Sequence, residues 1–261
     1  MLEPNTASIS HLPTHIILAI LHAEDQRLGT HQGVALNRIY EVLEYSYNTG
    51  APLRGASTIP MQLAKNLYGN TERSYIRKLN DMLAAWYLRL YYSTPELLAL
   101  YLQAVEIRPH IYGIERGSME YFGKPLALLN TDEATLLATM IRAPIIYDQW
   151  LHSPSPAQAV STQVIDKLKQ RFMVVQFYVF CDRKLRLKSA VDALNAGAVT
   201  MSSFIETASI GDLDLYYWCA NHSVFKSDFS SIQHYFAQSY DQLITDILER
   251  NQAKLLAPTG Q

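Results

Sequence analysis

Carboxylate side chains that could transfer a proton stand at the end of the first apolar stretch of the chain. Glu24 and Asp25 directly follow Ala23, and Arg27 and His31 come soon after them. A carboxyl group at the edge of an apolar segment has its pKa raised by desolvation, which suits a general acid or base. The alternative is a surface ion pair between one of these carboxylates and Arg27.

Two later segments add hydroxyl, amide and basic groups. In the first, Gln62 and Lys65 are three residues apart, so on a helix they share a face. In the second, three cations accompany one acid, Asp81. The polar residues of the two segments are Ser57, Thr58, Gln62, Lys65, Asn66, Arg73, Arg77, Lys78 and Asp81. The alternatives are a solvated helix face and a surface ion pair between Arg77 and Asp81, worth under about 1 kcal/mol.

Together, these carboxylates and cations suit a glycosyl transfer in which the leaving group is a phosphate. A carboxylate would activate the attacking hydroxyl, while Arg and Lys would bind the departing oxyanion. The sequence has no Gly-rich phosphate loop and no GxGxxG, HExxH or GxSxG pattern, and its eight histidines lack metal-ligand spacing. We therefore expect no organic cofactor.

The composition is that of a globular protein rather than a disordered or fibrous one. The chain has 261 residues, 49% of them hydrophobic and 18% charged, and its formal net charge is −2. At about 150 residues for each domain, this length gives one or two domains. The balanced charge provides no basic field for nucleic acid. Cys181 and Cys219 are too far apart for a CxxC motif, and we expect both to be buried thiols.

Helices are expected to position the polar segments. Helical spacing and capping residues predict helices over residues 16–23, 34–47, 74–92 and 96–105, one from a cap at Ser57 or Thr58 to Tyr68, and one from Thr131. No segment alternates convincingly with period two. The predicted fold class is therefore mainly α.

A change of character near residues 153–157 predicts a boundary between residues 1–152 and 153–261. Apolar residues at 3-4 spacing predict that the second part is a helical extension, whose function the sequence does not indicate. Within it, residues 167–188 are basic and residues 192–249 are acidic. The basic stretch either contacts anionic lipid headgroups, at roughly 1 kcal/mol for each Lys or Arg, or pairs with the acidic region.

The sequence shows no segment with the length of a membrane span. The longest aliphatic run near the start covers residues 16–21, whereas a span needs about 20 apolar residues. The N-terminus also lacks the basic region of a signal peptide. We therefore expect neither an export signal nor an anchor.

Five short motifs occur in the order found in one enzyme family. They are AEDQRLGTHQG at residues 23–33, GASTIPMQLAKN at 55–66, RKLND at 77–81, LLALYLQ at 97–103 and a segment from Glu133 to Tyr147. With these motifs the chain resembles the peptidoglycan glycosyltransferases, family 51, the polymerase domain of bifunctional penicillin-binding proteins. The resemblance covers residues 12–150, and the last hundred residues match no family by eye.

The resemblance implies a lysozyme-like helical fold that polymerises lipid II, a disaccharide-pentapeptide on undecaprenyl pyrophosphate, into a nascent glycan strand with inversion at the anomeric carbon. It implies that Glu24 deprotonates the attacking 4-hydroxyl and that Asp81 helps the pyrophosphate leave, with Mg²⁺ or Mn²⁺ bound at Asp81. The residues expected to bind substrate are Asp25, Arg27, His31, Ser57, Thr58, Gln62, Lys65, Asn66, Arg73, Arg77 and Lys78. The family's location is the extracytoplasmic face of the cytoplasmic membrane; without a visible anchor, the cytoplasm is the alternative.

Departures from the family's motifs keep other readings open. Asp81 is one methylene shorter than the family's glutamate, and a displacement of ~1 Å costs on the order of 100-fold in rate. Pro60 and Met61 are expected to remove two hydrogen-bonding groups from the cleft. Other departures are Leu28, Ala35, Arg89, Ala99 and Gln103. These changes favour, as an alternative, a pseudoenzyme that binds lipid II or glycan or acts as a scaffold. Hydrolysis of glycan by Glu24 is a third reading.

Overall fold

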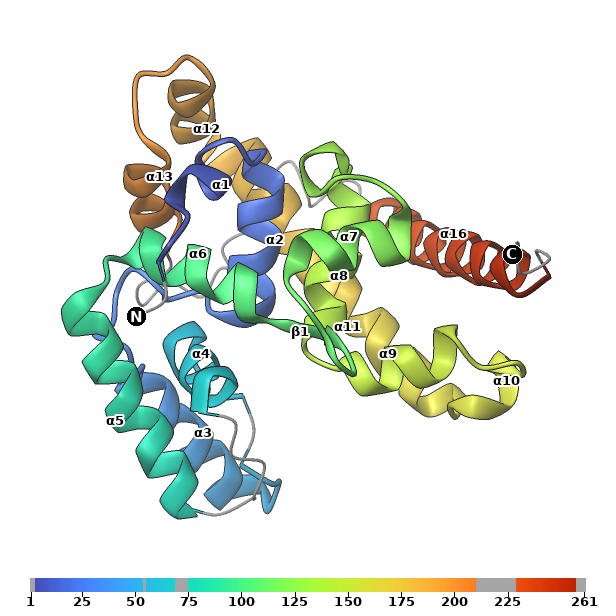
Figure 1. The fold of residues 1–261 in the computed structure, drawn as a ribbon, viewed down its shortest axis with the longest axis horizontal. Coiled ribbons are helices and arrows are strands. Elements are labelled where there is room, and N and C mark those ends of the chain that lie inside the picture. Colours follow the sequence, from blue (N-terminus) through green and yellow to red (C-terminus); the bar gives the residue numbers. More distant parts are fainter. Residues whose placement is uncertain (1–2, 54, 69–74, 210–228, 257–261) are drawn as a thin grey trace. The chain divides into compact units, whose positions relative to one another are not determined.

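The structure is a computed structural model that describes residues 3–53, 55–68, 75–209 and 229–256. Helices make up most of these residues (Figure 1), so the prediction of a mainly α fold is confirmed. The chain divides into two compact units. Unit 1 comprises residues 1–11, 24–105 and 189–211, and unit 2 comprises residues 12–23, 106–188 and 212–261.

Unit 1 contains the helices that follow the first polar motif. Its helices are α1 (Thr6–Ser10), α3 (Leu36–Thr49), α4 (Ile59–Tyr68), α5 (Tyr75–Tyr91), α6 (Thr94–Ala104), most of α12 (Lys188–Asn195) and α13 (Met201–Ala208). Helix α4 packs against both α5 and α6. Apolar side chains from all three helices form one buried cluster: Leu63, Ala64, Leu88, Leu97 and Leu100. This cluster fixes α4, which carries Gln62, Lys65 and Asn66 of the candidate site.

Local sequence signals explain where several helices begin. Helix α6 starts with a capping box, in which the Ser93 N–H donates to Glu96 Oε2 at 2.7 Å, and Pro95 lies in the first turn. These hydrogen bonds from Ser93 lower the pKa of Glu96. Helix α8 (Thr131–Ile141) starts with a second capping box, formed by Asn130 and Glu133. The predicted starts of these two helices are therefore confirmed.

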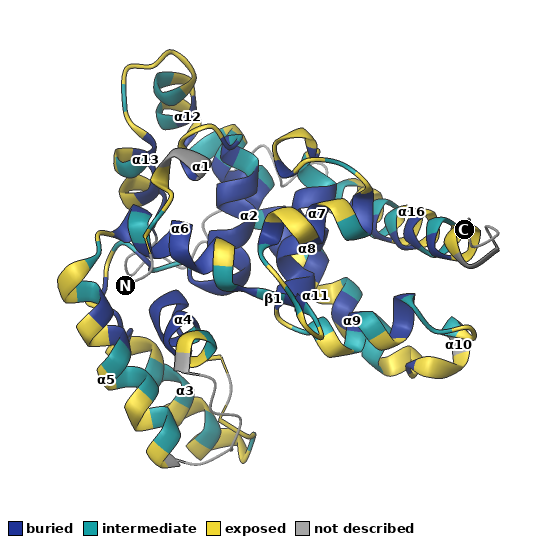
Figure 2. Cartoon of the chain, in the orientation of Figure 1, coloured by how far each residue is buried: buried dark blue, intermediate teal, exposed yellow. Residues whose placement is uncertain are grey.

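Unit 2 is built around α8. Its other elements are α2 (Thr14–Glu24, through Ala23), β1 (Glu106–Arg108), β2 (Ile111–Tyr112), α7 (Ile114–Phe122), η1 (Leu126–Leu128), α9 (Pro144–Leu151), α10 (Pro156–Ala159), α11 (Thr162–Cys181), the π-helical turn η2 (Asp182–Arg186) and α16 (Phe229–Leu256). Helix α8 packs against α11 and α16, and Figure 2 shows it as almost wholly buried.

Strands β1 and β2 pair antiparallel, and the sequence pattern does not predict them. With three and two residues, they are too short to show a period of two. The turn between them includes His110, whose φ is 67°.

The apolar stripes of the predicted extension lie on α11 and α16. Phe172 on α11 and Tyr240 on α16 are both buried, and their ring centroids are 5.3 Å apart. Residues 189–211 of the same segment instead belong to unit 1. The boundary near residues 153–157 stays a prediction.

Intramolecular pairing accounts for part of the basic stretch. Lys169 Nζ lies 2.5 Å from Asp241 Oδ2 in the acidic region, as the pairing alternative expects. Arg186 pairs with Asp182, which also lies 2.7 Å from His22 Nε2. Burial alone would raise the pKa of Asp182, but the bonds from Arg186 and His22 lower it. The exposed cations of the stretch include Lys167, Lys184 and Lys188.

Cys181 is buried and forms a disulfide bond. The prediction of a buried thiol is therefore wrong for Cys181, and Cys219 lies outside the described residues. Over the part of the chain that the structure describes, every helix is too short or too polar to cross a bilayer.

Candidate functional site

Glu24 lies at the C-terminal end of α2 and is 6% exposed. Its Oε2 accepts a hydrogen bond from Gln62 Nε2 on α4, at 2.8 Å. The other amide atom, Gln62 Oε1, accepts from the hydroxyl of Tyr101 on α6, at 3.0 Å. Since the tyrosine bond fixes which end of the amide is the acceptor, the Gln62 NH₂ must face the Glu24 carboxylate. The chain Tyr101–Gln62–Glu24 thus orients one carboxylate oxygen.

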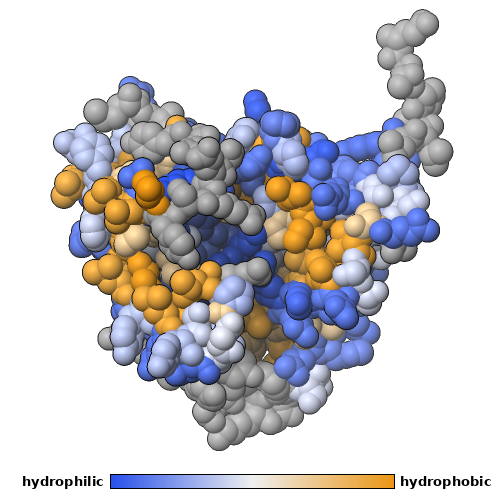
Figure 3. Space-filling view, turned by 90° about the horizontal axis from the view of Figure 1, so that it is seen from below, coloured by the Kyte–Doolittle hydropathy of each residue, from blue (hydrophilic) through white to orange (hydrophobic). Residues whose placement is uncertain are grey.

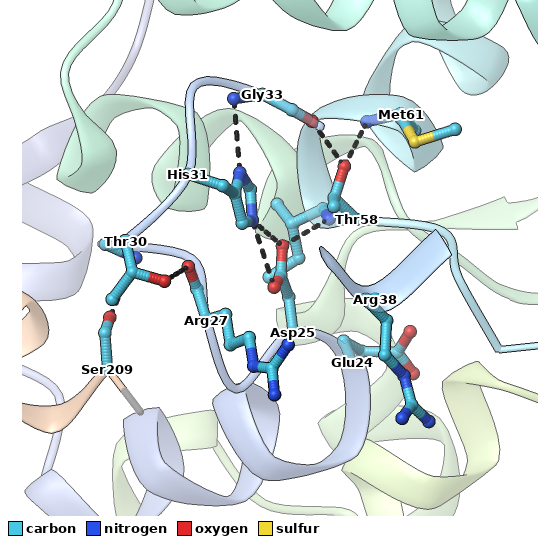
Figure 4. Close-up of polar contacts among 12 residues, drawn as sticks. Glu24, Asp25, Arg27, Thr30, His31, Gly33, Arg38, Thr58, Met61 and Ser209 are labelled. Atoms are coloured by element: carbon cyan, nitrogen blue, oxygen red, sulfur yellow. Dashed lines mark hydrogen bonds and ion pairs between the residues drawn. The ribbon is translucent and has the colours of Figure 1, made fainter. Parts of the chain in front are cut away.

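Asp25 holds the loop after Glu24 against the start of α4 (Figure 4). Its Oδ2 accepts from the backbone N–H of Ile59 at 2.9 Å and lies 3.0 Å from His31 Nε2. His31 Nδ1 accepts from the Gly33 N–H at 3.1 Å, so the ring proton is on Nε2 and points to Asp25. The negative charge of the Asp25 carboxylate also interacts favourably with the positive end of the α4 helix dipole. Asp25 therefore caps α4 from a distant loop.

Thr58 and Gly33 join the same loop to α4 and α5. The Thr58 hydroxyl donates to the Gly33 carbonyl at 2.6 Å and accepts from the Met61 N–H at 3.3 Å. Gly33 has a φ of 92°, and a Cβ there would lie 2.5 Å from the Ala85 carbonyl oxygen. Only glycine fits at position 33, where the loop backbone crosses the backbone of α5 at Ala85. Asp25, His31 and Thr58 are all buried, so their polar atoms serve the protein's own framework.

Arg27 is held by an acid on α3. Its Nη1 donates to Glu41 Oε1 at 2.9 Å, and Arg38 donates to the other oxygen at 3.0 Å. Burial would raise the pKa of Glu41, but the hydrogen bonds and charges of Arg38 and Arg27 lower it. The predicted ion pair of Arg27 with Glu24 or Asp25 is replaced by this pair with Glu41.

The cations of the third motif gather beside α4. Lys78 Nζ donates to Ser57 Oγ at 2.7 Å. Burial lowers the pKa of Lys78, the charges of Arg77 and Lys65 lower it further, and the charge of Asp81 raises it. Lys65, Arg77 and Asp81 therefore all lie within electrostatic reach of Lys78.

Two other predicted residues are placed differently. Asn66 Nδ2 donates to the Ala104 carbonyl at 3.2 Å, which ties α4 to the end of α6. Arg73 lies outside the described residues. The structure thus brings together Glu24 with Gln62, and Lys65 with Lys78 and Asp81; Gln62 and Lys65 are one turn apart on α4.

A divalent cation at Asp81 was implied by the resemblance. Over the described residues, no group of three or more His, Cys, Asp or Glu side chains could hold a metal ion. Asp81 instead has Lys78 as its charged neighbour. A cation at Asp81 would therefore need further oxygen ligands, such as those of a substrate.

The structure corrects the interpretation of Met61. Its side chain is 1% exposed and packs with Val34 and Ala85, and Pro60 is buried as well. These two departures from the family pattern therefore change the core between α4 and α5. The sequence suggested that they remove hydrogen-bonding groups from the polar site, but both side chains lie in this core instead.

Sequence reasoning missed two residues that hold the site. Tyr101, described above, stands inside the fourth motif but had no assigned role. Arg142, in the fifth motif, donates from Nη1 to the carbonyl of Ala23, one residue before Glu24, at 2.5 Å. The available signals in the sequence were a tyrosine within an apolar segment, whose hydroxyl needs a partner when buried, and an arginine directly after the apolar residues of α8.

Comparison with known proteins identifies the family of this chain. The family described as Transglycosylase matches residues 3–169, which is more than half of the chain. The chain belongs to the transglycosylase family. The match includes every predicted site residue and ends within α11, so that most of the segment after residue 169 lies outside it.

Individual relatives carry names from cell-wall synthesis. The chain is 37% identical over 159 residues to a biosynthetic peptidoglycan transglycosylase of Shewanella oneidensis, covering 60% of this chain and 64% of that protein. It is 40% identical over 139 residues to the Shewanella amazonensis protein of that name, covering 53% and 56%. It is 31% identical over 171 residues to penicillin-binding protein 1A of Aquifex aeolicus, covering 66% and 24%. The chain thus spans less than two thirds of each of these relatives.

Proposed function

We propose that this transglycosylase family member is a peptidoglycan glycosyltransferase that polymerises lipid II disaccharide into glycan strands. The single observation that carries the proposal is the face of α4. Gln62 on this face binds Glu24, and Lys65, three residues later, lies near Lys78. A proton acceptor and two cations thereby lie beside one helix. The names of the relatives support the same reaction.

In this reaction Glu24 accepts the proton of the 4-hydroxyl of the acceptor sugar. The hydroxyl oxygen forms a bond to the anomeric carbon of the donor as the bond from that carbon to the diphosphate oxygen breaks, which inverts the anomeric centre. The hydrogen bond from Gln62 keeps one oxygen of Glu24 occupied and directs the other. Lys65 and Lys78 bind the departing diphosphate, whose negative charge increases as the bond breaks.

Asp81 would assist the departure of the diphosphate. When bound, Mg²⁺ or Mn²⁺ would neutralise charge on the diphosphate, with Asp81 as its protein ligand. Ser57 accepts a hydrogen bond from the Lys78 ammonium group and so keeps this cation beside the start of α4. Asp25, His31 and Thr58 then act by holding the loop and α4 together, rather than by contacting the substrate.

The surface of α3 and α5 fits a lipid-linked substrate. Apolar residues at 3-4 spacing are exposed on both helices: Leu36, Tyr40, Leu43 and Tyr47 on α3, and Ile76, Leu79, Leu83, Trp86 and Leu90 on α5. We call these two sets the apolar stripes; hydrophobic groups cover much of the left side of Figure 3. No side chain of α3 is buried. Exposed apolar faces of this size with aromatic residues are typical of membrane interfaces. The location that follows is the outer face of the cytoplasmic membrane, where lipid II is polymerised.

A pseudoenzyme that binds lipid II is the second candidate. It is favoured by the short side chain of Asp81 and by the pairing of Arg27 with Glu41, which takes one predicted phosphate ligand away. Such a protein would bind the substrate through Lys65 and Lys78 without transferring the sugar.

The deciding experiment incubates the purified chain with labelled lipid II, detergent and Mg²⁺ or Mn²⁺, and separates the glycan products by length. We expect glycan strands from the wild-type chain and none from Glu24→Gln. Glu44→Gln, which changes an exposed glutamate on α3, is the matched control and should behave as wild type. Lipid II binding with no polymer in any detergent would favour the pseudoenzyme. Neither binding nor product would overturn both candidates. Release of reducing ends from cell-wall sacculi would instead show hydrolysis.

A further inference from the structure

Ser209, which directly follows α13, touches the loop that follows Glu24. Its Oγ accepts a hydrogen bond from the Gly29 N–H at 2.8 Å and donates to the Ile205 carbonyl, in the last turn of α13, at 3.0 Å. The residue is buried. One hydroxyl therefore satisfies a loop donor and a helix-end acceptor together, which alanine cannot do.

Gly29 allows this close approach. A Cβ at this position would lie 2.6 Å from Ser209 Oγ, 3.1 Å from Ser209 Cβ and 3.3 Å from the Cα of Glu206. Any side chain here would push α13 away from the loop. The contact thus depends on a glycine in the first motif and on a serine 180 positions later.

Helix α13 also packs against α6. Its buried side chains are Met201, Phe204, Ile205 and Ala208, and the helix contacts α6. Helix α6 carries Tyr101, which orients Gln62 and through it Glu24. The segment 201–209 lies beyond residue 169, where the match to the family ends. A part of the chain with no assigned role therefore touches two elements that hold Glu24.

We propose that Ser209 is a positioning residue, by which the C-terminal segment holds the loop of residues 25–33 in the geometry that Glu24 needs. Its catalytic consequence rests on the proposed function, whereas its effect on the loop does not. Loss of the Ser209 hydroxyl leaves the partly buried Gly29 N–H without its acceptor and frees the loop that carries Asp25 and His31. Glu24 then spends less time in the reactive position, so kcat falls more than the KM for lipid II changes.

The test compares Ser209→Ala with Ser203→Ala, the same substitution at an exposed serine of α13. Amide hydrogen exchange over residues 25–33 is measured in the whole chain, without substrate. We expect exchange to be about 2- to 10-fold faster in Ser209→Ala, as for the loss of one hydrogen bond, and unchanged in Ser203→Ala. Gly29→Ala should have the same effect, and adding it to Ser209→Ala should increase exchange by less than the sum of the single effects.

The catalytic part is read from the split between kcat and KM on lipid II. A several-fold lower kcat with a KM within twofold of wild type, and recovery in Ser209→Thr, supports the proposal. Faster loop exchange with unchanged kcat would show that the contact is structural only, and overturns the positioning role. Equal exchange in all variants overturns the proposal altogether. A wild-type chain without turnover would defeat the proposed function, and exchange alone would then decide whether Ser209 holds the loop.

Discussion

The amide of Gln62 donates to Glu24 at 2.8 Å and accepts from Tyr101 at 3.0 Å. The tyrosine hydroxyl thus determines which end of the amide meets the carboxylate. In Tyr101→Phe the amide can turn its oxygen towards Glu24, where the two oxygens repel. We expect about a tenfold lower kcat, equivalent to ~1.4 kcal/mol and to one hydrogen bond. Steady-state kinetics on lipid II checks this, and a kcat equal to wild type would show that the amide needs no such support.

Asp25 is expected to contribute mainly to folding. Asp25→Ala removes the acceptor of the Ile59 N–H and the partner of His31, both in buried surroundings. The expected loss is about 2–3 kcal/mol in the free energy of unfolding, measured by urea titration. Asp25→Asn, which keeps one acceptor oxygen, should lose less. If the alanine variant unfolds at the wild-type urea concentration, the capping role assigned to Asp25 is wrong.

The pKa of Lys78 is expected to set the alkaline limit of activity. Burial and the charges of Arg77 and Lys65 lower its pKa in the folded chain, so it loses its proton below the usual pH range of lysine. Between the folded and the unfolded pKa of Lys78, the unfolded chain binds more protons than the folded chain, so this group makes the free energy of unfolding rise with pH. Over the same pH range the folded chain binds phosphate more weakly, because Lys78 loses its positive charge. In Lys78→Arg the alkaline limb of the rate profile should move to higher pH, because arginine stays charged. A profile with an unmoved alkaline limb would exclude Lys78 as its cause.

Asp81→Glu is expected to raise the rate. The extra methylene returns the carboxylate to the length that the family motif has, and ~1 Å of placement can change a rate on the order of 100-fold. Polymer formation from labelled lipid II at fixed Mg²⁺ measures the gain. A variant that binds lipid II as the wild type does but forms no more polymer would favour the pseudoenzyme.

The apolar stripes predict binding to lipid vesicles. Leu90 on α5 is 82% exposed and Leu83 is 52% exposed. Leu83→Asn combined with Leu90→Asn should reduce co-sedimentation with vesicles at least several-fold, since each leucine buries apolar area in the interface. Leu128→Asn changes a leucine outside the stripes that is 69% exposed, between the values of the other two, and serves as the control. Vesicle binding that follows anionic lipid content, and not these leucines, would point instead to the basic residues 167–188.

Local signals in the sequence predicted most of the helices of unit 1. The Ser93–Glu96 capping box and the glycine after Thr49 are short-range features, and α6 and α3 begin and end close to them. The apolar pattern of α3 predicted a helix correctly, but none of its side chains is fully buried. A stripe at helical spacing indicates that one face is apolar, and not what that face contacts.

The candidate site was predictable in its members and less so in their roles. Motif order identified Glu24, Gln62 and Lys65; the structure places Gln62 and Lys65 on α4, and Gln62 donates a hydrogen bond to Glu24 at the end of α2. That Asp25 caps α4 from 34 positions away depends on how the chain returns, which spacing does not reveal. The contact of Ser209 with Gly29 is still more distant in the sequence and lies in a segment without a motif.

Gly33 limits how this loop can vary. At the crossing with Ala85, two stretches of main chain are separated by less room than one methyl group occupies. A clash with a side chain can be relieved by substitution or repacking, whereas a clash with the Ala85 backbone carbonyl cannot be relieved by changing a side chain. Sequence libraries that vary this loop should therefore return active clones with many residues at exposed Gln32 and with glycine alone at its neighbour.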